Sequence, residues 1–194
     1  MSKKFYVAYG SNLNIEQMMW RCPTAKFYST GVIEDYELQF KGSPNCAFAT
    51  ISLCKGSKVP AAVWEIEPRD EMSLDRYEGY PSHYFKENVK VKLDGKEINA
   101  MVYIMNLKMN FGMPTLGYYR IVKSGYLHCG FDTSVLDKAV SDSVMKYYQQ
   151  SERIHLLDNF HAINPNEDNM ADEEETELSE FDGDETFGQF GGMV

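Results

Sequence analysis

The segment Tyr9-Gly10-Ser11-Asn12 combines residue types that can bind an anion through the backbone. The preceding run from Phe5 to Tyr9 is rich in aromatic and β-branched residues and predicts a strand. Gly10 favours a tight turn, and Asn14 can cap a helix that begins at Ile15. Backbone N–H groups at such a junction lack acceptors and suit a carboxylate or a developing oxyanion. A turn without a ligand is the alternative for this segment taken alone.

Glu78 is the second residue that points to chemistry. It precedes Gly79 at a predicted helix end, and Tyr77, Tyr80 and Tyr84 lie near it in the sequence. A carboxylate among aromatic side chains loses water, so its pKa rises and it can transfer protons near neutral pH. The plainer interpretation is a surface glutamate beside a glycine that ends a helix. No metal-ligand spacing joins the four histidines, so we expect no metal site.

Seven short segments predict the strands that must position these groups. Their ranges are 5–9, 26–32, 36–41, 48–53, 59–67, 84–93 and 97–105. Asp94-Gly95 indicates a two-residue hairpin turn, while Glu34-Asp35 and Lys55-Gly56-Ser57 are predicted to interrupt the sheet. Because most strands follow one another as hairpins, we expect an α+β fold. Its sheet is expected to be small, mixed, curved and barrel-like, with six to seven strands and inserted helices.

Four helices are predicted around this sheet. The first three cover residues 15–20, 70–77 and 115–129, and the last begins near residue 133. Their predicted N-terminal caps are Asn14, Asp70, Thr115 and either Thr133 or Ser134. Apolar residues recur at helical spacing in the last helix, which predicts that one of its faces joins the core.

The charge distribution divides the chain of 194 residues into two parts. Residues 158–194 hold 12 of the 29 acidic side chains and no lysine or arginine, which leaves 17 acidic against 19 basic in residues 1–157. We therefore expect a domain over 1–157 and an acidic tail over 158–194 with the composition of a disordered segment. Phe187 and Phe190 are candidate docking residues for a protein partner, and a terminus that binds nothing is the alternative.

The composition argues against several classes of protein. The nearly neutral domain lacks the basic patch of a nucleic-acid binder. No segment resembles a signal peptide or a membrane span, so we expect no membrane association. The four cysteines have no Cys-x-x-Cys spacing, which is typical of reduced thiols in a cytoplasmic protein.

The two chemical segments together resemble the gamma-glutamylcyclotransferase-like family. The resemblance extends from about Phe5 to Leu136. The residues that carry it are Tyr9-Gly10-Ser11-Asn12-Leu13, Arg21-Cys22-Pro23, Ala49-Thr50-Ile51, Leu74-Asp75-x-x-Glu78-Gly79 with Tyr84, and Tyr118 seven positions before Gly125. The family resemblance implies a small mixed barrel with helices, a cavity at its mouth, and neither a metal nor an organic cofactor.

The resemblance also implies roles for individual residues. Glu78 matches the catalytic glutamate of the family. The substrate-binding positions are matched by Tyr9, Gly10, Ser11, Asn12, Tyr84 and Tyr118. Ala61 replaces a common glycine, and Pro81 and His83 depart from the pattern on the side of the leaving group.

The activity implied by the resemblance is conversion of a γ-glutamyl compound to 5-oxoproline, with release of the free amine or amino acid. Glu78 would take a proton from the substrate α-amine and return it to the leaving nitrogen. Backbone N–H groups of Gly10 to Asn12 would hold either the α-carboxylate or the oxyanion. The alternative is a binding or regulatory module that recognises glutamyl groups without turnover and engages a partner through its acidic tail.

Overall fold

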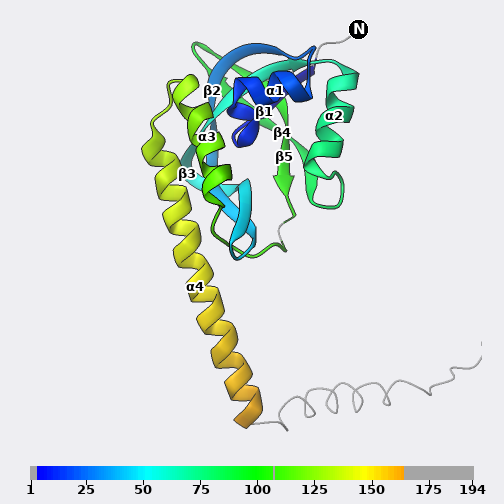
Figure 1. Cartoon of the computed structure of the whole chain (residues 1–194). Coiled ribbons are helices and arrows are strands. Elements are labelled where there is room, and N and C mark those ends of the chain that lie inside the picture. Colours follow the sequence, from blue (N-terminus) through cyan, green and yellow to red (C-terminus); the bar gives the residue numbers. More distant parts are fainter. Residues whose placement is uncertain (1–3, 107, 164–194) are drawn as a thin grey trace, which may run out of the picture. The chain divides into compact units, whose positions relative to one another are not determined.

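The computed structural model describes residues 4–106 and 108–163, with side chains through residue 157. Five strands of this part of the chain close a barrel in the order β1-β3-β2-β4-β5 (Figure 1). Their bounds are β1 Lys4–Ala8, β2 Lys26–Ser43, β3 Cys46–Ile66, β4 Tyr84–Leu93 and β5 Lys96–Met105. The barrel closes where β1 pairs in parallel with β5, and the other pairs are antiparallel. The expected α+β class and barrel-like sheet are confirmed.

The predicted number of six to seven strands is wrong, because two predicted breaks lie inside long strands. Asp35 of β2 has a φ of 60°, and its Oδ1 accepts the N–H of Gly56 in β3 at 2.7 Å. Pairing continues on both sides of this irregularity. The facing turn-like sequences therefore bend one hairpin without ending its strands, which helps a sheet to curve into a barrel.

Four α-helices and a short 3-10 turn surround the barrel in the described residues. Their bounds are η1 Ser11–Leu13, α1 Ile15–Arg21, α2 Pro68–Glu78, α3 Leu116–His128 and α4 Thr133–Ile163. The Asn14 side chain accepts the Gln17 N–H at 3.0 Å, and Thr115 accepts the Tyr118 N–H at 3.2 Å. These two predicted caps are confirmed.

Two other predicted caps are wrong. Glu67 is the N-cap of α2, and Asp70 lies at the third helical position, where it accepts the Glu67 N–H in a capping box. At the start of α4, Asp132 accepts the Ser134 N–H at 2.9 Å. In both cases the residue directly before the helix is acidic, Glu67 before α2 and Asp132 before α4. An acidic side chain at this position offers an acceptor to the N–H groups of the first turn.

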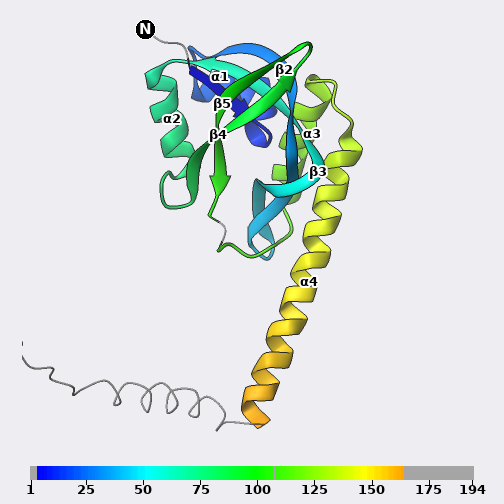
Figure 2. The ribbon, with the colours of Figure 1, turned by 180° about the vertical axis from the view of Figure 1, so that it is seen from behind.

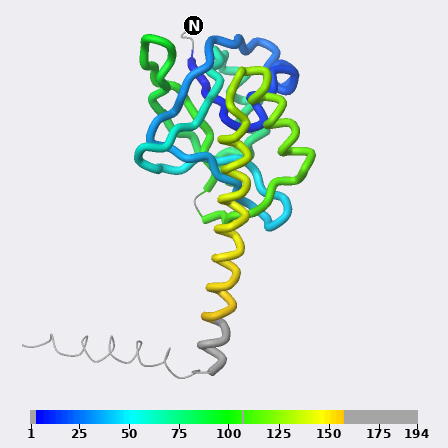
Figure 3. Tube along the Cα trace, turned by 90° about the vertical axis from the view of Figure 1, so that its left-hand side faces the viewer, coloured from blue at the N-terminus to red at the C-terminus, as the bar shows by residue number. Residues whose placement is uncertain are grey.

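The helices lie on different sides of the barrel. Figures 1 and 2 show α2 on one side and α3 with the first turns of α4 on the other. An ion pair of 3.6 Å joins Lys123 of α3 to Asp137 of α4, and Ser143 of α4 accepts the N–H of Phe40 in β2 at 2.9 Å. The side view in Figure 3 shows these first turns of α4 beside the barrel.

One compact unit of the chain ends at Gln149. Helix α4 itself continues to Ile163, so the predicted boundary between residues 157 and 158 falls within a helix. The rest of the predicted acidic tail, with Phe187 and Phe190, lies outside the described residues. No helix of the described residues is both long enough and apolar enough to span a membrane.

Buried apolar residues anchor the elements that carry the candidate site. Leu74 of α2 lies one turn before Glu78, and Val122 of α3 lies one turn after Tyr118; both are fully buried. Leu13, next to Asn12 in η1, is also fully buried. Burial of such a side chain contributes about 1.5–3 kcal/mol. The site therefore stands on three separately anchored segments.

Candidate active site

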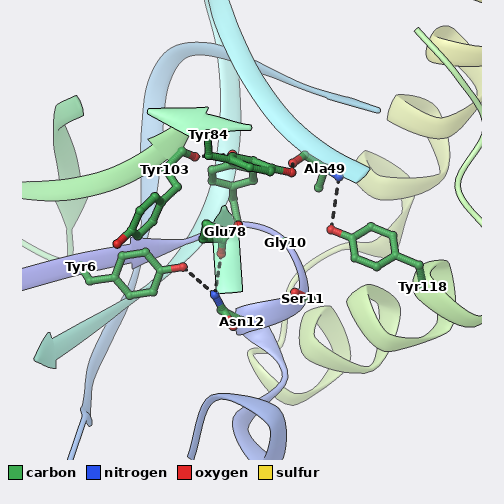
Figure 4. A pocket seen from close by; sticks show the side chains of 10 residues that line it. Tyr6, Gly10, Ser11, Asn12, Ala49, Glu78, Tyr84, Tyr103 and Tyr118 are labelled. Carbon is green, nitrogen blue, oxygen red and sulfur yellow. Dashed lines mark hydrogen bonds between the residues drawn. The ribbon is translucent and has the colours of Figure 1, made fainter. Parts of the chain in front are cut away.

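All seven residues predicted for the site line one small cavity (Figure 4). The volume of this inner cavity is about 30 Å³. Its wall consists of Tyr6, Tyr9, Gly10, Ser11, Asn12, Ala49, Glu78, Tyr84, Tyr103 and Tyr118. The structure thus joins the first turn of the chain to the end of α2, to α3 and to four strands, β1, β3, β4 and β5.

Glu78 is the last residue of α2. Gly79 follows it with a φ of 64°, the left-handed conformation that ends many helices and favours glycine. A Cβ at this position would also lie only 2.9 Å from the Nδ1 atom of His83. The helix can therefore stop directly after Glu78, whose carboxyl group faces the cavity.

The amide of Asn12 connects Glu78 to two other side chains. Its Nδ2 atom donates to Glu78 Oε1 at 3.1 Å and to the Tyr6 hydroxyl at 2.9 Å. Its Oδ1 atom accepts from the guanidinium of Arg21 at 2.6 Å, and that guanidinium lies 3.7 Å from the centre of the Tyr77 ring. Because a guanidinium can only donate, Arg21 fixes which end of the amide faces Glu78.

Burial raises the pKa of Glu78 to about 7, against the opposing effects of the Arg21 charge and the Asn12 hydrogen bond. A carboxyl group with this pKa can both accept and return a proton near neutral pH. Burial likewise raises the pKa values of Tyr6, Tyr9, Tyr84 and Tyr118, so their hydroxyl groups stay neutral. The cavity thus holds one titrating acid among neutral phenols.

The tyrosine hydroxyl groups fall into two kinds. Those of Tyr9 and Tyr84 donate to the backbone carbonyls of Tyr103 and Ala49, at 2.5 and 3.0 Å, and Tyr103 donates to Asp75 at 2.6 Å. The hydroxyl of Tyr118 instead accepts the Ala49 N–H at 3.2 Å, as that of Tyr6 accepts the Asn12 amide. Among the hydrogen bonds of the described residues, Tyr6 and Tyr118 therefore keep a proton to donate.

Little space is left for a side chain at Gly10. Its φ is −114°, so the turn does not need a left-handed residue. A Cβ at this position would lie 3.2 Å from the Ala49 Cβ and 3.3 Å from the Tyr118 hydroxyl oxygen. The first turn thus approaches β3 and α3 closely, which brings the backbone of Ser11 and Asn12 into the cavity wall.

A second, larger space begins where the inner cavity ends. This outer cleft has a volume of about 660 Å³ and shares Ser11, Glu78, Tyr84 and Tyr118 with the inner cavity. The rest of its wall is formed by Gly42, Ser43, Cys46, Phe48, Arg76, Tyr77, Gly79, His83, Met105 and Met109. Since both spaces reach Glu78, His83, the one residue of the stretch from Pro81 to His83 that lines the cleft, does not separate the cleft from the carboxyl group.

Besides Ala49, three residues of the site were not predicted from the sequence as site residues. Tyr6 and Tyr103 lie on strands and have the pattern of core aromatics; only the pairing of β1 with β5 brings their rings to a centroid distance of 5.9 Å. Arg21 ends α1 and donates to Gln17 one turn earlier, a spacing that is also typical of a surface pair. Within residues 4–106 and 108–163, no group of His, Cys, Asp and Glu side chains is suited to hold a metal ion.

Comparisons with known proteins agree with the resemblance found in the sequence. Residues 6–125 match the family model "Gamma-glutamyl cyclotransferase, AIG2-like". A Homo sapiens gamma-glutamylcyclotransferase is 32% identical over 142 residues, which cover 69% of this chain and 75% of that protein. The Bos taurus protein of the same name is 37% identical over 110 residues, which cover 52% and 58% of the two chains.

A solved structure gives the same result in three dimensions. A gamma-glutamyl cyclotransferase superposes with a TM-score of 0.65 at 29% identity, over 71% of this chain and 86% of that chain. The family match covers the first turn, α2 with Glu78, and α3 with Tyr118. The chain therefore belongs to the gamma-glutamyl cyclotransferase, AIG2-like family and is an enzyme of that family.

Proposed function

We propose that this enzyme converts a γ-glutamyl compound to 5-oxoproline and releases the attached amine or amino acid, with Glu78 as the general acid and base. The observation that carries the proposal is the pKa and the position of the Glu78 carboxyl group. Its carboxyl group has a pKa of about 7, is held by Asn12, and faces both the inner cavity and the outer cleft. No other carboxylate lines either space within the described residues.

The substrate carries its own nucleophile, because its α-amine can close a five-membered ring at the γ-carbonyl. As an ammonium group the amine cannot attack, so ionised Glu78 first removes a proton. The neutral amine then adds to the γ-carbonyl, and the bond between that carbon and the leaving nitrogen breaks. Protonated Glu78 returns its proton to the leaving nitrogen. Ionised again, it carries the second proton of the ring nitrogen to the released amine, which leaves as an ammonium ion. Glu78 therefore ends ionised, as it began.

The other groups of the inner cavity stabilise and orient the substrate in this proposal. Backbone N–H groups from Gly10 to Asn12 bind the α-carboxylate or the oxyanion, and the Tyr6 and Tyr118 hydroxyl groups are further donors. Holding the glutamyl chain in a ring-closing conformation keeps the amine close to the γ-carbonyl. Such proximity lowers the activation barrier by about 7–11 kcal/mol in favourable cases. A nucleophilic side chain is not needed.

A cytoplasmic location also belongs to this proposal. It is supported by the four cysteines, Cys22, Cys46, Cys54 and Cys129, which are all free thiols in the structure.

The test is incubation of the full chain with a panel of γ-glutamyl compounds, with 5-oxoproline measured by mass spectrometry. The same mixtures without protein give the spontaneous rate of cyclisation. We expect 5-oxoproline and the free amine to appear in equal amounts. Binding of a γ-glutamyl compound without any 5-oxoproline would instead support a recognition module.

A further inference from the structure

The outer cleft differs from the inner cavity in the chemistry of its wall. Apart from Glu78, its ionisable side chains include one guanidinium, Arg76, and one imidazole, His83. Large apolar side chains also line the cleft, and they are Phe48, Tyr77, Met109 and the largely buried Met105. Among the described residues, a cationic group that enters this cleft would therefore find no carboxylate other than Glu78, which the reaction itself uses.

The side chain of Arg76 has no hydrogen bond or ion pair among the described residues. It is exposed in the last turn of α2. Its neighbour Asp75 accepts from Lys86 and from Tyr103, so that carboxylate is already paired. Lys86, in contrast, is bonded to both Asp75 and Glu71, at 2.9 and 2.7 Å. Arg76 is thus an unpaired cation at the cleft wall, available for an anionic group of a ligand.

The apolar part of the wall is exposed enough to bind a ligand. Phe48 and Tyr77 are 42% and 46% exposed. Burying such surface against an apolar ligand removes it from water. Met109, which is partly exposed, adds a flexible thioether chain, which adapts to apolar groups of different shape. The volume of about 660 Å³ lies in the range of small-molecule sites.

We propose that the outer cleft selects the leaving group, and that the preferred leaving group is an amino acid with a large apolar side chain whose carboxylate binds Arg76. This inference rests on the proposed function, which places the γ-carbonyl beside Glu78. The leaving nitrogen then lies at the junction of the two spaces, and the rest of the leaving group extends into the cleft. The Arg76 guanidinium disfavours polyamine or lysine side-chain leaving groups, because these carry a positive charge.

Two matched substrates separate the contribution of the carboxylate from that of the apolar side chain. They are γ-glutamyl-phenylalanine and γ-glutamyl-phenylalanine amide, which differ in the terminal charge alone. We expect kcat/KM to be roughly 10-fold higher for the free acid, as for a charge-assisted hydrogen bond. γ-Glutamyl-glycine and γ-glutamyl-putrescine should be slower than γ-glutamyl-phenylalanine, because they lack the apolar group or carry a cation.

Substitution of Arg76 completes the experiment. Arg76→Gln should remove the preference for the free acid through a higher KM, and leave the amide nearly unchanged. Arg120→Gln is the matched control, because Arg120 is an exposed arginine of α3 that lines neither space. Thermal unfolding of both variants reports whether they fold.

The outcomes distinguish this inference from the proposed function. Absence of 5-oxoproline with every substrate would refute both. Turnover that is equal for the acid and the amide, insensitive to Arg76→Gln, or fastest with γ-glutamyl-putrescine would refute the assignment of the leaving group and leave the cyclotransferase reaction intact. Loss of the preference in Arg76→Gln alone supports it.

Discussion

The inner cavity and the outer cleft meet at Glu78 but are built in different ways. In the inner cavity the polar side chains bond to one another or to the backbone, as Asn12 does with Glu78, Tyr6 and Arg21. In the outer cleft the wall is more apolar, and its cation Arg76 is unpaired among the described residues. One space is fixed before the substrate arrives, and the other is adaptable.

We infer from this difference that the inner cavity binds the glutamyl part of the substrate and the outer cleft binds the leaving group. Preorganised donors suit a group that is the same in every turnover, because no reorganisation is needed at the moment of reaction. Methionine and aromatic surfaces suit a group that varies. We therefore expect substitutions in the inner cavity to lower kcat for all substrates, and substitutions in the cleft to change KM in a way that depends on the leaving group.

The largest expected effect is that of Glu78→Gln. The amide keeps the size of the side chain but cannot accept the proton of the substrate amine, so kcat should fall by at least about 100-fold. Glu87→Gln, on the exposed face of β4, is the control and should retain activity. Turnover is measured as 5-oxoproline formed, and near-normal turnover in Glu78→Gln would remove Glu78 from the mechanism.

A comparably strong effect on binding is expected for Gly10→Val. A Cβ at this position already lies 3.2 Å from the Cβ of Ala49, and the added methyl groups would displace the turn. We expect binding of 5-oxoproline, measured by calorimetry, to be lost. A Cβ at Gly117 meets no heavy atom within 4 Å, so Gly117→Val is the matched control. Unchanged affinity in Gly10→Val would show that the turn backbone does not contact the ligand.

Arg21→Met tests whether the inner cavity is preorganised by the amide of Asn12. The Arg21 charge lowers the pKa of Glu78, so its removal should raise that pKa. Because the base acts in its ionised form, the acidic limb of kcat/KM should move to higher pH. A pKa that is higher by about 1 would lower kcat/KM roughly 10-fold at pH 6. The loss should be smaller at pH 8.

Arg21→Lys is the conservative variant, since it keeps the charge and one donor to Asn12. It should restore the position of the acidic limb at least in part. An acidic limb that stays in place in Arg21→Met would mean that Arg21 contributes to folding alone.

Local sequence signals predicted the parts of this site that depend on neighbouring residues. Gly79 marks the end of α2 because a left-handed residue is needed there, and this places Glu78 at the helix end. Asn14 and Thr115 begin α1 and α3 through hydrogen bonds that span three residues. The hairpin at Asp94-Gly95 joins β4 to β5 as predicted. Caps, helix ends and tight turns depend on residues a few positions apart, so a single sequence is enough to predict them.

The features that sequence reasoning missed depend on distant contacts. Asp35 and Gly56 look like separate turns until their hydrogen bond, across 21 positions, joins them in one hairpin. The role of Arg21 depends on the direction of the Asn12 side chain, and that of Tyr6 on the closure of the barrel. Residue type and spacing do not contain these relations, because packing decides them.

The smallest expected effect is on stability, and it distinguishes the two spaces without any substrate. The folded protein raises the pKa of Glu78 from 4.5 to about 7, so burial favours the protonated form. The contribution of this group to stability is therefore full below pH 4.5 and is lost as the pH rises through 7. In Glu78→Gln that part of the decline in melting temperature should disappear, whereas Arg76→Gln in the cleft should keep it. Each kcal/mol corresponds to about 2–4 °C for a chain of this size, so thermal unfolding between pH 4.5 and 8 resolves the difference. The same slope in both variants would mean that Glu78 is not held in a water-poor cavity, and the contrast between a closed inner cavity and an open cleft would no longer stand.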